Sequence, residues 1–514
     1  MATNGKNAIA NLIGSLAGPL IGLVMTPFYL RIIGLEGLGL VGLMALITTV
    51  VGVFVAGVSK TYQRDLATAQ VNAPEDLNGL LIGGMLLFGA LGVILGVIVL
   101  AAGQFQIQAI ASDTRFSIET LSRSLVIISA LLTLGITSSA ISSVLVSFKD
   151  QVWPNTFGIS VGLLTAITSW FCLSTWPRVD VFYFCQLGGG VLGFLMLALR
   201  CHVILRRKTS GISSRKTREI WKNKIHSSGK LSLVLIIHEG LGVLISQVDR
   251  ILITSYFPIT ALGAYNLGAN PSRFVGIFTN PINAVTYPDF CRLAENESNP
   301  QAIGEYLGRI SFILTTLFAS AMIVLIPAGD DMLNLWLGEG NVPEQAPSCF
   351  ILLSAGSLLL AVAGPAYNLT VAHGRVGYGI PKNIISLLLL PVLGLWSIQL
   401  CGLAGVAALP VVYAINCILT CNWFAYKRHA DIGSAYRWIS GAMSCIGIAA
   451  ILSLILYQTE FEGITMISIA SLTSILFFSG MNIAYFGRSP KSWIHALEIN
   501  PKNNETKFIP DPVL

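Results

Sequence analysis

Residues 78–102 read NGLLIGGMLLFGALGVILGVIVLAA and contain no charged side chain. A helix needs about 20 mostly apolar residues to cross the hydrocarbon core of a bilayer. The stretch lacks the strict alternation of apolar and polar residues that marks a strand of a membrane barrel. Because backbone groups find no water in lipid, only helices and closed barrels span it. The stretch therefore predicts a transmembrane helix, and similar runs recur along the whole chain.

The composition is that of a membrane protein. Of 514 residues, 54% are hydrophobic and 11% are charged, whereas soluble domains carry about 25% charged residues. The mean hydropathy is +0.73. These values exclude a soluble globular protein and also a disordered chain. The net charge of +6 does not indicate a nucleic-acid partner, because multispanning proteins collect Lys and Arg in their cytoplasmic loops.

The apolar runs predict an all-α integral membrane protein with about 14 transmembrane helices, and 12 are also compatible with the pattern. The predicted spans are 8–30, 37–58, 78–102, 121–147, 155–175, 181–205, 231–256, 261–286, 308–328, 347–371, 380–400, 402–426, 438–457 and 463–486.

The basic residues predict that both termini are cytoplasmic. With the N-terminus placed inside, most Lys and Arg fall in inner segments, and the outer segments hold only Arg31, Arg115 and Arg178. This asymmetry follows the positive-inside rule and requires an even number of spans.

A basic segment at 206–230, RRKTSGISSRKTREIWKNKIHSSGK, follows the sixth span. We interpret it as a cytoplasmic interdomain loop, with a lipid or partner site as the alternative. It separates an N-lobe of spans 1–6 (residues 1–205) from a C-lobe of spans 7–12 (residues 231–430). Spans 13 and 14 occupy residues 431–487, and residues 488–514 form a polar cytoplasmic tail.

A faint internal repeat links the two lobes. RIIGLEGLGLVGLMAL (31–46) aligns with SYFPITALGAYNLGAN (255–270) at an offset of 224 residues, which matches Gly39 to Gly263 and Ala45 to Ala269. Two six-helix lobes of the same orientation would produce such a pattern, as in transporters with parallel repeats.

Motifs of soluble enzymes find no support in this sequence. The GxGxxG at Gly37–Gly42 opens a membrane helix, so close helix packing explains it better than a dinucleotide site. The pair His238-Glu239 begins an HExxH motif, but Gly242 replaces the second His. No P-loop motif and no CxxC pair occurs. We therefore predict neither a cofactor nor a metal.

Polar residues inside the seventh and eighth spans are candidates for function, because ionisable groups in lipid are costly. The seventh span carries His238, Glu239, Asp249 and Arg250. On a continuous helix, Glu239 and Arg250 would share one face, as would His238 and Asp249. The charged pairs either join helices together or line a cavity.

The eighth span adds Asn270 and Arg273, and Arg273 is about twelve residues from either end of 261–286. A midplane Arg with no acid on its own helix favours an anion-binding cavity, because guanidinium stays charged and holds phosphate with two hydrogen bonds. The alternative is an ion pair with an acid on another helix. Arg64 and Asp65, just past the second span, form either a cytoplasmic gate or a plain loop pair.

Several stretches resemble the polysaccharide flippase family, which exports lipid-linked O-antigen and related repeat units and belongs to the multidrug/oligosaccharidyl-lipid/polysaccharide exporter superfamily. TPFYLRIIGLEGLGLVGL (26–43) is similar to its first-to-second helix junction. SQVDRILITSYFPITALGAYNLGANPSRF (246–274) resembles its seventh and eighth helices. GDDMLNLWLGEG (329–340), NLTVAHGRVGYGIPKN (368–383) and CGLAGVAAL (401–409) resemble later parts, in the same order.

The resemblance implies a V-shaped, two-lobed bundle in a bacterial inner membrane that opens alternately to each side. Its substrate would be an undecaprenyl-pyrophosphate-linked oligosaccharide, whose pyrophosphate meets cavity arginines while the lipid tail stays in the bilayer. Arg273, Arg250, Arg31 and Arg64 occupy places similar to the family's cavity residues. A glycan polymerase and a chain-length regulator would be its partners, together with membrane lipids and an H⁺ or Na⁺ coupling ion.

Two other functions compete with a flippase. A cation-coupled multidrug or metabolite exporter of the same superfamily would use acidic cavity groups, for which Asp249 and Glu239 are candidates. A membrane enzyme would need a large external loop with catalytic groups, and the outer stretches are short. We therefore predict a transporter rather than an enzyme.

Overall fold

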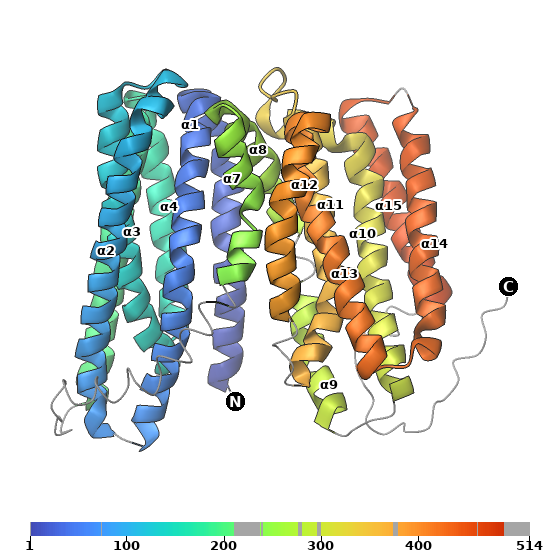
Figure 1. The fold of residues 1–514 in the computed structure, drawn as a ribbon, viewed down its shortest axis with the longest axis horizontal. Coiled ribbons are helices and arrows are strands. Elements are labelled where there is room, and N and C mark those ends of the chain that lie inside the picture. Colours follow the sequence, from blue (N-terminus) through green and yellow to red (C-terminus); the bar gives the residue numbers. More distant parts are fainter. Residues whose placement is uncertain are drawn as a thin grey trace. The chain divides into compact units, whose positions relative to one another are not determined.

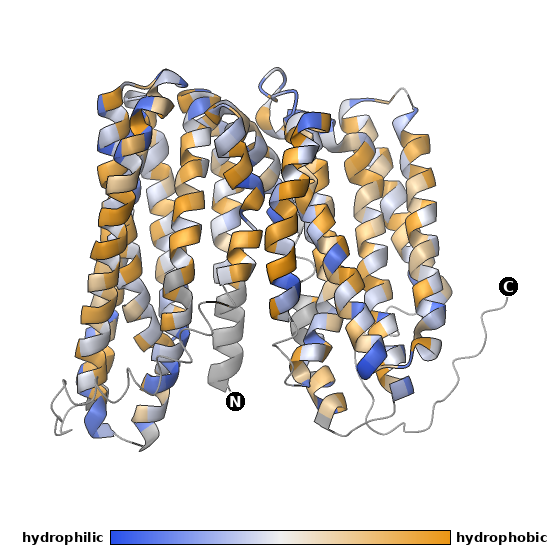
Figure 2. Cartoon of the chain, viewed as in Figure 1, coloured by the Kyte–Doolittle hydropathy of each residue, from blue (hydrophilic) through white to orange (hydrophobic). Residues whose placement is uncertain are grey.

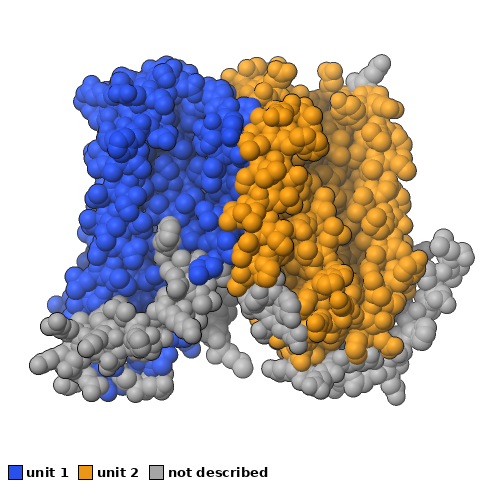
Figure 3. Space-filling model, viewed as in Figure 1, with its two compact units in different colours: residues 1–266 blue, residues 267–514 orange. Residues whose placement is uncertain are grey.

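A computed structural model describes residues 2–72, 74–209, 237, 240–275, 280–295, 300–373, 379–459 and 461–487. Within these ranges the regular structure is helical and includes no strand (Figure 1). The all-α prediction is therefore confirmed. Contacts divide the chain into two compact units, residues 1–266 and 267–514 (Figure 3).

Among the described residues of unit 1, six α-helices lie wholly before the division. Helix α3 packs against α1, α2 and α5, while α4 packs against α1 and α5. Their bounds are α1 Ala2–Asn72, α2 Leu77–Ser112, α3 Ile118–Ser147, α4 Val152–Thr175, α5 Val179–Thr209 and α7 Val248–Tyr256.

Helix α1 contains one sharp break. Gly34 has φ 72° and ψ −176°, whereas the residues on both sides are helical. This region of backbone space is open essentially to glycine alone. The two predicted spans 8–30 and 37–58 occupy the two arms of α1, so the expected connection at 31–36 is reduced to a single non-helical residue.

Helix α8 (Ile259–Val275) crosses the division between the units. Unit 2 then contains α9 Asn280–Glu295, α10 Pro300–Leu337, α11 Ala346–Ala372, α12 Gly379–Ala407, α13 Leu409–Arg428, α14 Ile432–Tyr457 and α15 Gly463–Phe486. Its core lies where α10 packs against α14 and α15, around Phe312, Trp438 and Phe486.

Eleven helices in the described ranges are long and apolar enough to cross a membrane, by length and composition. The first of them, Ile13–Val53, includes the Gly34 break and so covers two predicted spans. Figure 2 shows hydrophobic residues along most of the helices. On α2, for example, Leu86 is 68% exposed and Val97 is 58% exposed. Such side chains need lipid around them. The exact count of fourteen spans remains a prediction.

The division between the units differs from the predicted boundary at 206–230, most of which lies outside the described residues. The contacts instead divide the chain between Asn266 and Leu267, inside α8. Before the division, α7 packs on α1, and Gly263 and Asn266 in the first part of α8 also lie against α1. After it, Gly268 lies against Cys349 and Phe350 of α11. The proposed lobe limits themselves remain a prediction.

Candidate substrate-binding site

The start of α8 is fixed to α1 by a reciprocal glycine contact. A Cβ added at Gly39 would collide with the backbone carbonyl of Ile259, and one added at Gly263 would collide with the carbonyl of Leu35. Leu35 and Ile259 are related by the same 224-residue offset as the two glycines. A Cβ at Gly42 would likewise meet the amide of Asn266, again 224 residues on. The two segments of the repeat therefore pack directly on one another in unit 1, through contacts that mirror each other.

The loop between α2 and α3 joins the α1 break to the same helix start. The Arg115 guanidinium donates from Nη2 to the carbonyl of Ile33, and the backbone N–H of Arg115 donates to Glu36 Oε2 at 2.9 Å. Asp113 Oδ2 accepts a 3.0 Å hydrogen bond from the N–H of Ile259. Side chains thus satisfy backbone groups that the two helix ends leave open.

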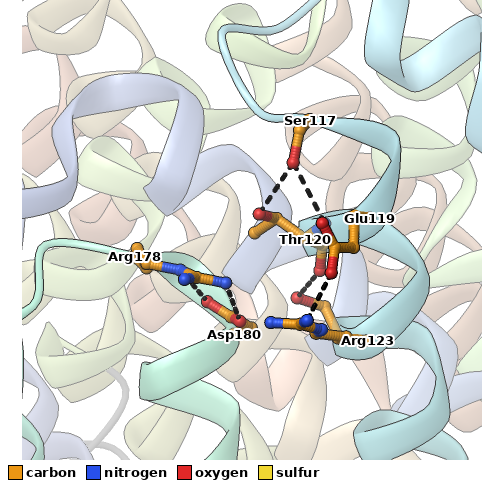
Figure 4. A network of polar contacts seen from close by, with 7 residues as sticks. Ser117, Glu119, Thr120, Arg123, Arg178 and Asp180 are labelled. Carbon is orange, nitrogen blue, oxygen red and sulfur yellow. Dashed lines mark hydrogen bonds and ion pairs between the residues drawn. The ribbon is translucent and has the colours of Figure 1, made fainter.

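A second network fixes the neighbouring ends of α3 and α5 (Figure 4). Ser117 caps α3 by accepting from the N–H of Thr120 at 3.2 Å. Arg178, one of the predicted outer arginines, donates to both carboxylate oxygens of Asp180 at 3.1 and 2.7 Å. These bonds stabilise the first residues of α3 and α5.

The seventh predicted span is interrupted where its charged residues lie. Residues 240–245 are helical, Ser246 and Gln247 form a turn, and α7 begins at Val248. The expected shared faces of Glu239 with Arg250 and of His238 with Asp249 assumed a continuous helix, and that assumption is wrong. Glu239 and His238 lie outside the described residues. Interrupted helices are typical of binding sites in transporters, because they expose backbone groups at membrane depth.

Asp249 and Arg250 are buried, each 7% exposed, in a polar cluster with Gln247 and Tyr265. Asp249 Oδ2 accepts a hydrogen bond from the Tyr265 hydroxyl, and its Oδ1 accepts from the N–H of Arg250 at 2.7 Å. Arg250 Nη1 donates to Gln247 Oε1 at 2.8 Å, and the guanidinium lies 5.9 Å from the centre of the Tyr265 ring.

The cluster leaves one donor unused. Arg250 Nε is buried without a hydrogen-bond partner, and so is the side-chain nitrogen of Asn266 on the next helix. A buried guanidinium with an open donor can receive an anion after a small movement. The same cluster also joins α7 to α8 through the hydrogen bond between Tyr265 and Asp249. The geometry of Asp249 and Arg250 is therefore compatible both with joining helices and with lining a cavity.

Arg273 lies in the last turn of α8 as described, three residues after Asn270. Its side chain is exposed, while Asn270 is half-buried. Pro271 lies between them and removes one backbone donor from the helix. The four residues after Val275 are outside the described ranges, so the midplane position of Arg273 remains a prediction.

The two remaining predicted cations are exposed and belong to α1. Arg64 pairs with Asp65 at 3.3 Å, and its side chain is 54% exposed while that of Asp65 is 10% exposed. Arg31 is exposed three residues before the Gly34 break. The structure therefore gathers Asp249 and Arg250 in one cluster, with Arg273 further along α8, and places Arg64 and Arg31 on different arms of α1.

Sequence reasoning missed one cation in unit 2. Lys382, at the start of α12, donates to the sulfur of Cys417 at 3.2 Å and lies 5.6 Å from the centre of the Tyr413 ring. Asn416 donates to Ser386 at 3.0 Å in the same region. The sequence does not single out this lysine, because only the packing of α12 on α13 brings these side chains together. Among the described residues, no group of three or more His, Cys, Asp or Glu could hold a metal.

Comparisons with known proteins place this geometry in context. A family model described as polysaccharide biosynthesis protein matches residues 4–294. No curated protein sequence matches the chain. The structure is similar to the lipid II flippase MurJ in an inward closed conformation, with TM-score 0.70 and 14% identity over 92% of this chain and 98% of that chain.

Two multidrug transporter structures are also similar. An inward-facing multidrug resistance MATE family transporter of the MOP superfamily gives TM-score 0.58 and 14% identity, over 83% of this chain and 99% of that chain. A mutant of the Vibrio cholerae MATE transporter VcmN gives TM-score 0.55 and 15% identity, over 83% and 97%. At these identities the likeness shows the fold.

Proposed function

Because the chain belongs to the polysaccharide biosynthesis protein family, we propose that it is a flippase for an undecaprenyl-pyrophosphate-linked oligosaccharide. It would move this repeat unit across a bacterial cytoplasmic membrane for surface polysaccharide synthesis. The family match carries this proposal, and the fold shared with a lipid II flippase supports it. The apolar exterior of the helices suits a protein whose substrate carries a long lipid tail.

In this proposal Arg273 binds the pyrophosphate. Arg273 is exposed on α8, and Asn270, three residues before it, is half-buried. Guanidinium suits pyrophosphate because its planar fork donates two parallel hydrogen bonds to one phosphate. Arg250 supplies positive charge from the buried cluster through its open Nε donor. Arg64 and Arg31 are proposed to contact the substrate at the ends of its path.

A cation-coupled drug or metabolite exporter is the second candidate. It is favoured by the buried Asp249 carboxylate and by the fold shared with MATE transporters. A carboxylate held by Tyr265 and the Arg250 N–H could take up and release an H⁺ or bind Na⁺. The same group could couple a flippase to an ion gradient.

We also propose a cellular location, a topology and partners for the protein. The protein would lie in the inner membrane with both termini in the cytoplasm, and would pass its product to a glycan polymerase and a chain-length regulator. Repeat units linked to lipid on the outer side are the substrate such partners require.

The test is deletion of the gene in its native host, followed by analysis of surface glycan and of lipid-linked repeat units. We expect loss of surface glycan, with lipid-linked units retained on the cytoplasmic side. Normal glycan together with new drug sensitivity would instead support the exporter.

Complementation then tests the anion site. Arg273→Ala should fail to restore glycan at normal protein abundance, and Arg273→Lys should restore it only in part, because lysine keeps the charge but lacks the fork. The matched control is Arg123→Ala, which removes an exposed arginine that pairs with Glu119 on α3. Normal export by Arg273→Ala would remove Arg273 from the site.

A further inference from the structure

Unit 2 contains a groove of about 670 Å³ between α10, α11, α13 and α14. Most of its lining is apolar, including Phe312, Val362, Leu419, Ile439, Met443 and Ile446. Leu419 is 64% exposed and Met443 is 65% exposed. The groove is therefore accessible from the lipid side of these helices, and an apolar chain is the chemistry that its walls suit.

Positive charge collects at one end of the groove, where a short turn joins α13 to α14. Lys427 lines the groove, and its ammonium lies 4.5 Å from the centre of the Trp423 ring. Arg437 and Arg309 lie 5.6 and 5.7 Å from the centre of the Trp438 ring, which also lines the groove. Aromatic and basic side chains of this kind gather at the headgroup level of membranes.

The acids at this end are already engaged. Glu305 accepts a 2.8 Å hydrogen bond from Arg309, and Asp431 caps α14 by accepting from the N–H of Ser434 at 2.8 Å. Arg309 Nε is nevertheless buried without a hydrogen-bond partner. Arg309, Lys427 and Arg437 are positive and Glu305 and Asp431 are negative, so this end of the groove has a net positive charge.

The length of the groove corresponds to one leaflet. Along α14 the lining runs from Ile432 to Ile446, an axial rise of about 21 Å at 1.5 Å per residue. Half of a bilayer with its headgroup layer is about 20–22 Å thick. The charged end would then lie at the level of lipid phosphates, and Ile446 near the ends of the acyl chains.

We propose that this groove binds one anionic phospholipid, with its phosphate at Lys427 and an acyl chain along α14. The predicted topology places the charged end in the cytoplasmic leaflet. The groove is formed only by residues 308–446, so it shares no residue with the cluster around Asp249 or with Arg273. The site is therefore independent of the proposed flippase function.

The experiment measures quenching of tryptophan fluorescence by phospholipids with brominated acyl chains, using the full chain in mixed micelles. Trp423 and Trp438 line the groove, and the Trp423→Phe protein identifies the signal of Trp423. We expect brominated phosphatidylglycerol to quench this signal at about one-fifth the concentration required for brominated phosphatidylcholine, because one lysine near an anionic headgroup gives about a fivefold preference.

Two pairs of variants locate the binding. Lys427→Gln should abolish the preference for phosphatidylglycerol, whereas Arg428→Gln, the same change at a neighbour that does not line the groove, should keep it. Ala442→Phe should block quenching by filling the groove. Ala450→Phe, at an exposed position of the same helix, should leave quenching intact.

Three results would overturn the proposal. Equal quenching by the two brominated lipids in the unmodified protein would show that charge is not recognised. Unchanged binding in both Lys427→Gln and Ala442→Phe would place the lipid elsewhere. Displacement of brominated phosphatidylglycerol by undecaprenyl phosphate, but not by excess unbrominated phosphatidylglycerol, would show that the groove belongs to the transported lipid instead.

Discussion

At the scale of single residues, Arg250 distinguishes a structural cluster from a binding site. Arg250→Ala would leave the buried Asp249 carboxylate beside Tyr265 without its neighbouring positive charge. It would also leave the Gln247 amide oxygen without the donor it has in Arg250 Nη1, and a buried acceptor that loses its donor costs about 1–3 kcal/mol. We therefore expect a strongly lowered melting temperature of the purified protein in detergent. Arg123→Ala, which breaks an exposed pair, should change stability by less than about 1 kcal/mol.

The double variant Asp249→Asn with Arg250→Met completes this test, because it removes both charges. It should recover much of the lost stability, since replacing a whole buried pair is often neutral. A thermostable Arg250→Ala protein that no longer supports glycan export would contradict the structural interpretation and place Arg250 in direct contact with substrate.

Tyr265 provides a second prediction at this scale. Tyr265→Phe removes the hydroxyl that donates to Asp249 and keeps the ring beneath Arg250. A buried acceptor that loses its donor costs about 1–3 kcal/mol, so the variant should unfold at a lower temperature. Tyr256→Phe, on an exposed tyrosine of α7, is the matched control and should melt like the unmodified protein.

At the scale of elements, the break in α1 depends on one glycine. Gly34→Ala would force an L side chain into a glycine-only conformation and bring its Cβ to 3.0 Å from the Arg115 guanidinium. We expect a loss of about 1–3 kcal/mol of stability, measured by thermal unfolding. Gly22→Ala, on the first arm of α1 with open space around it, should not destabilise the protein. Equal behaviour of the two variants would show that the break at Gly34 is not required.

The reciprocal glycine contact between α1 and α8 allows a sharper test. Gly39→Ala and Gly263→Ala each place a methyl group on a backbone carbonyl of the other helix, so each should lower the melting temperature. Because both changes open the same contact, the double variant should cost less than the sum of the two. Gly52→Ala, on the same arm of α1 as Gly39 with open space around it, is the control. Strict additivity would mean that the two glycines act separately.

The elements also show where sequence reasoning succeeds and fails. Long apolar runs predict the helices because length and hydropathy are local properties. The 224-residue offset pairs Gly39 with Gly263 and predicts two similar lobes, but it does not predict that the two segments pack on one another. The turn at Ser246–Gln247 contains no glycine or proline to mark it, so the sequence predicts a continuous seventh helix, which the structure interrupts at this turn. The Lys382 environment could not be foreseen, because it depends on how α12 packs against α13.

At the scale of the whole molecule, the distribution of charge predicts which end of each helix faces the cytoplasm. Helix α10 offers a direct test because it has 38 residues, more than the roughly 20 needed to cross the hydrocarbon core. Ala302 and Glu339 are exposed near its two ends. Single cysteines at these positions, in a protein whose nine native cysteines are replaced, can be labelled with a membrane-impermeant maleimide.

In intact spheroplasts, Glu339→Cys should react and Ala302→Cys should react only after the membrane is permeabilised. This result follows from cytoplasmic termini and an even number of spans, because α10 then runs outward from its N-terminal end. The reverse pattern would invert the whole topology and would move the charged end of the α13–α14 groove to the outer leaflet. Reaction of both cysteines from outside would mean that α10 does not cross the membrane. The predicted number of spans would then be wrong.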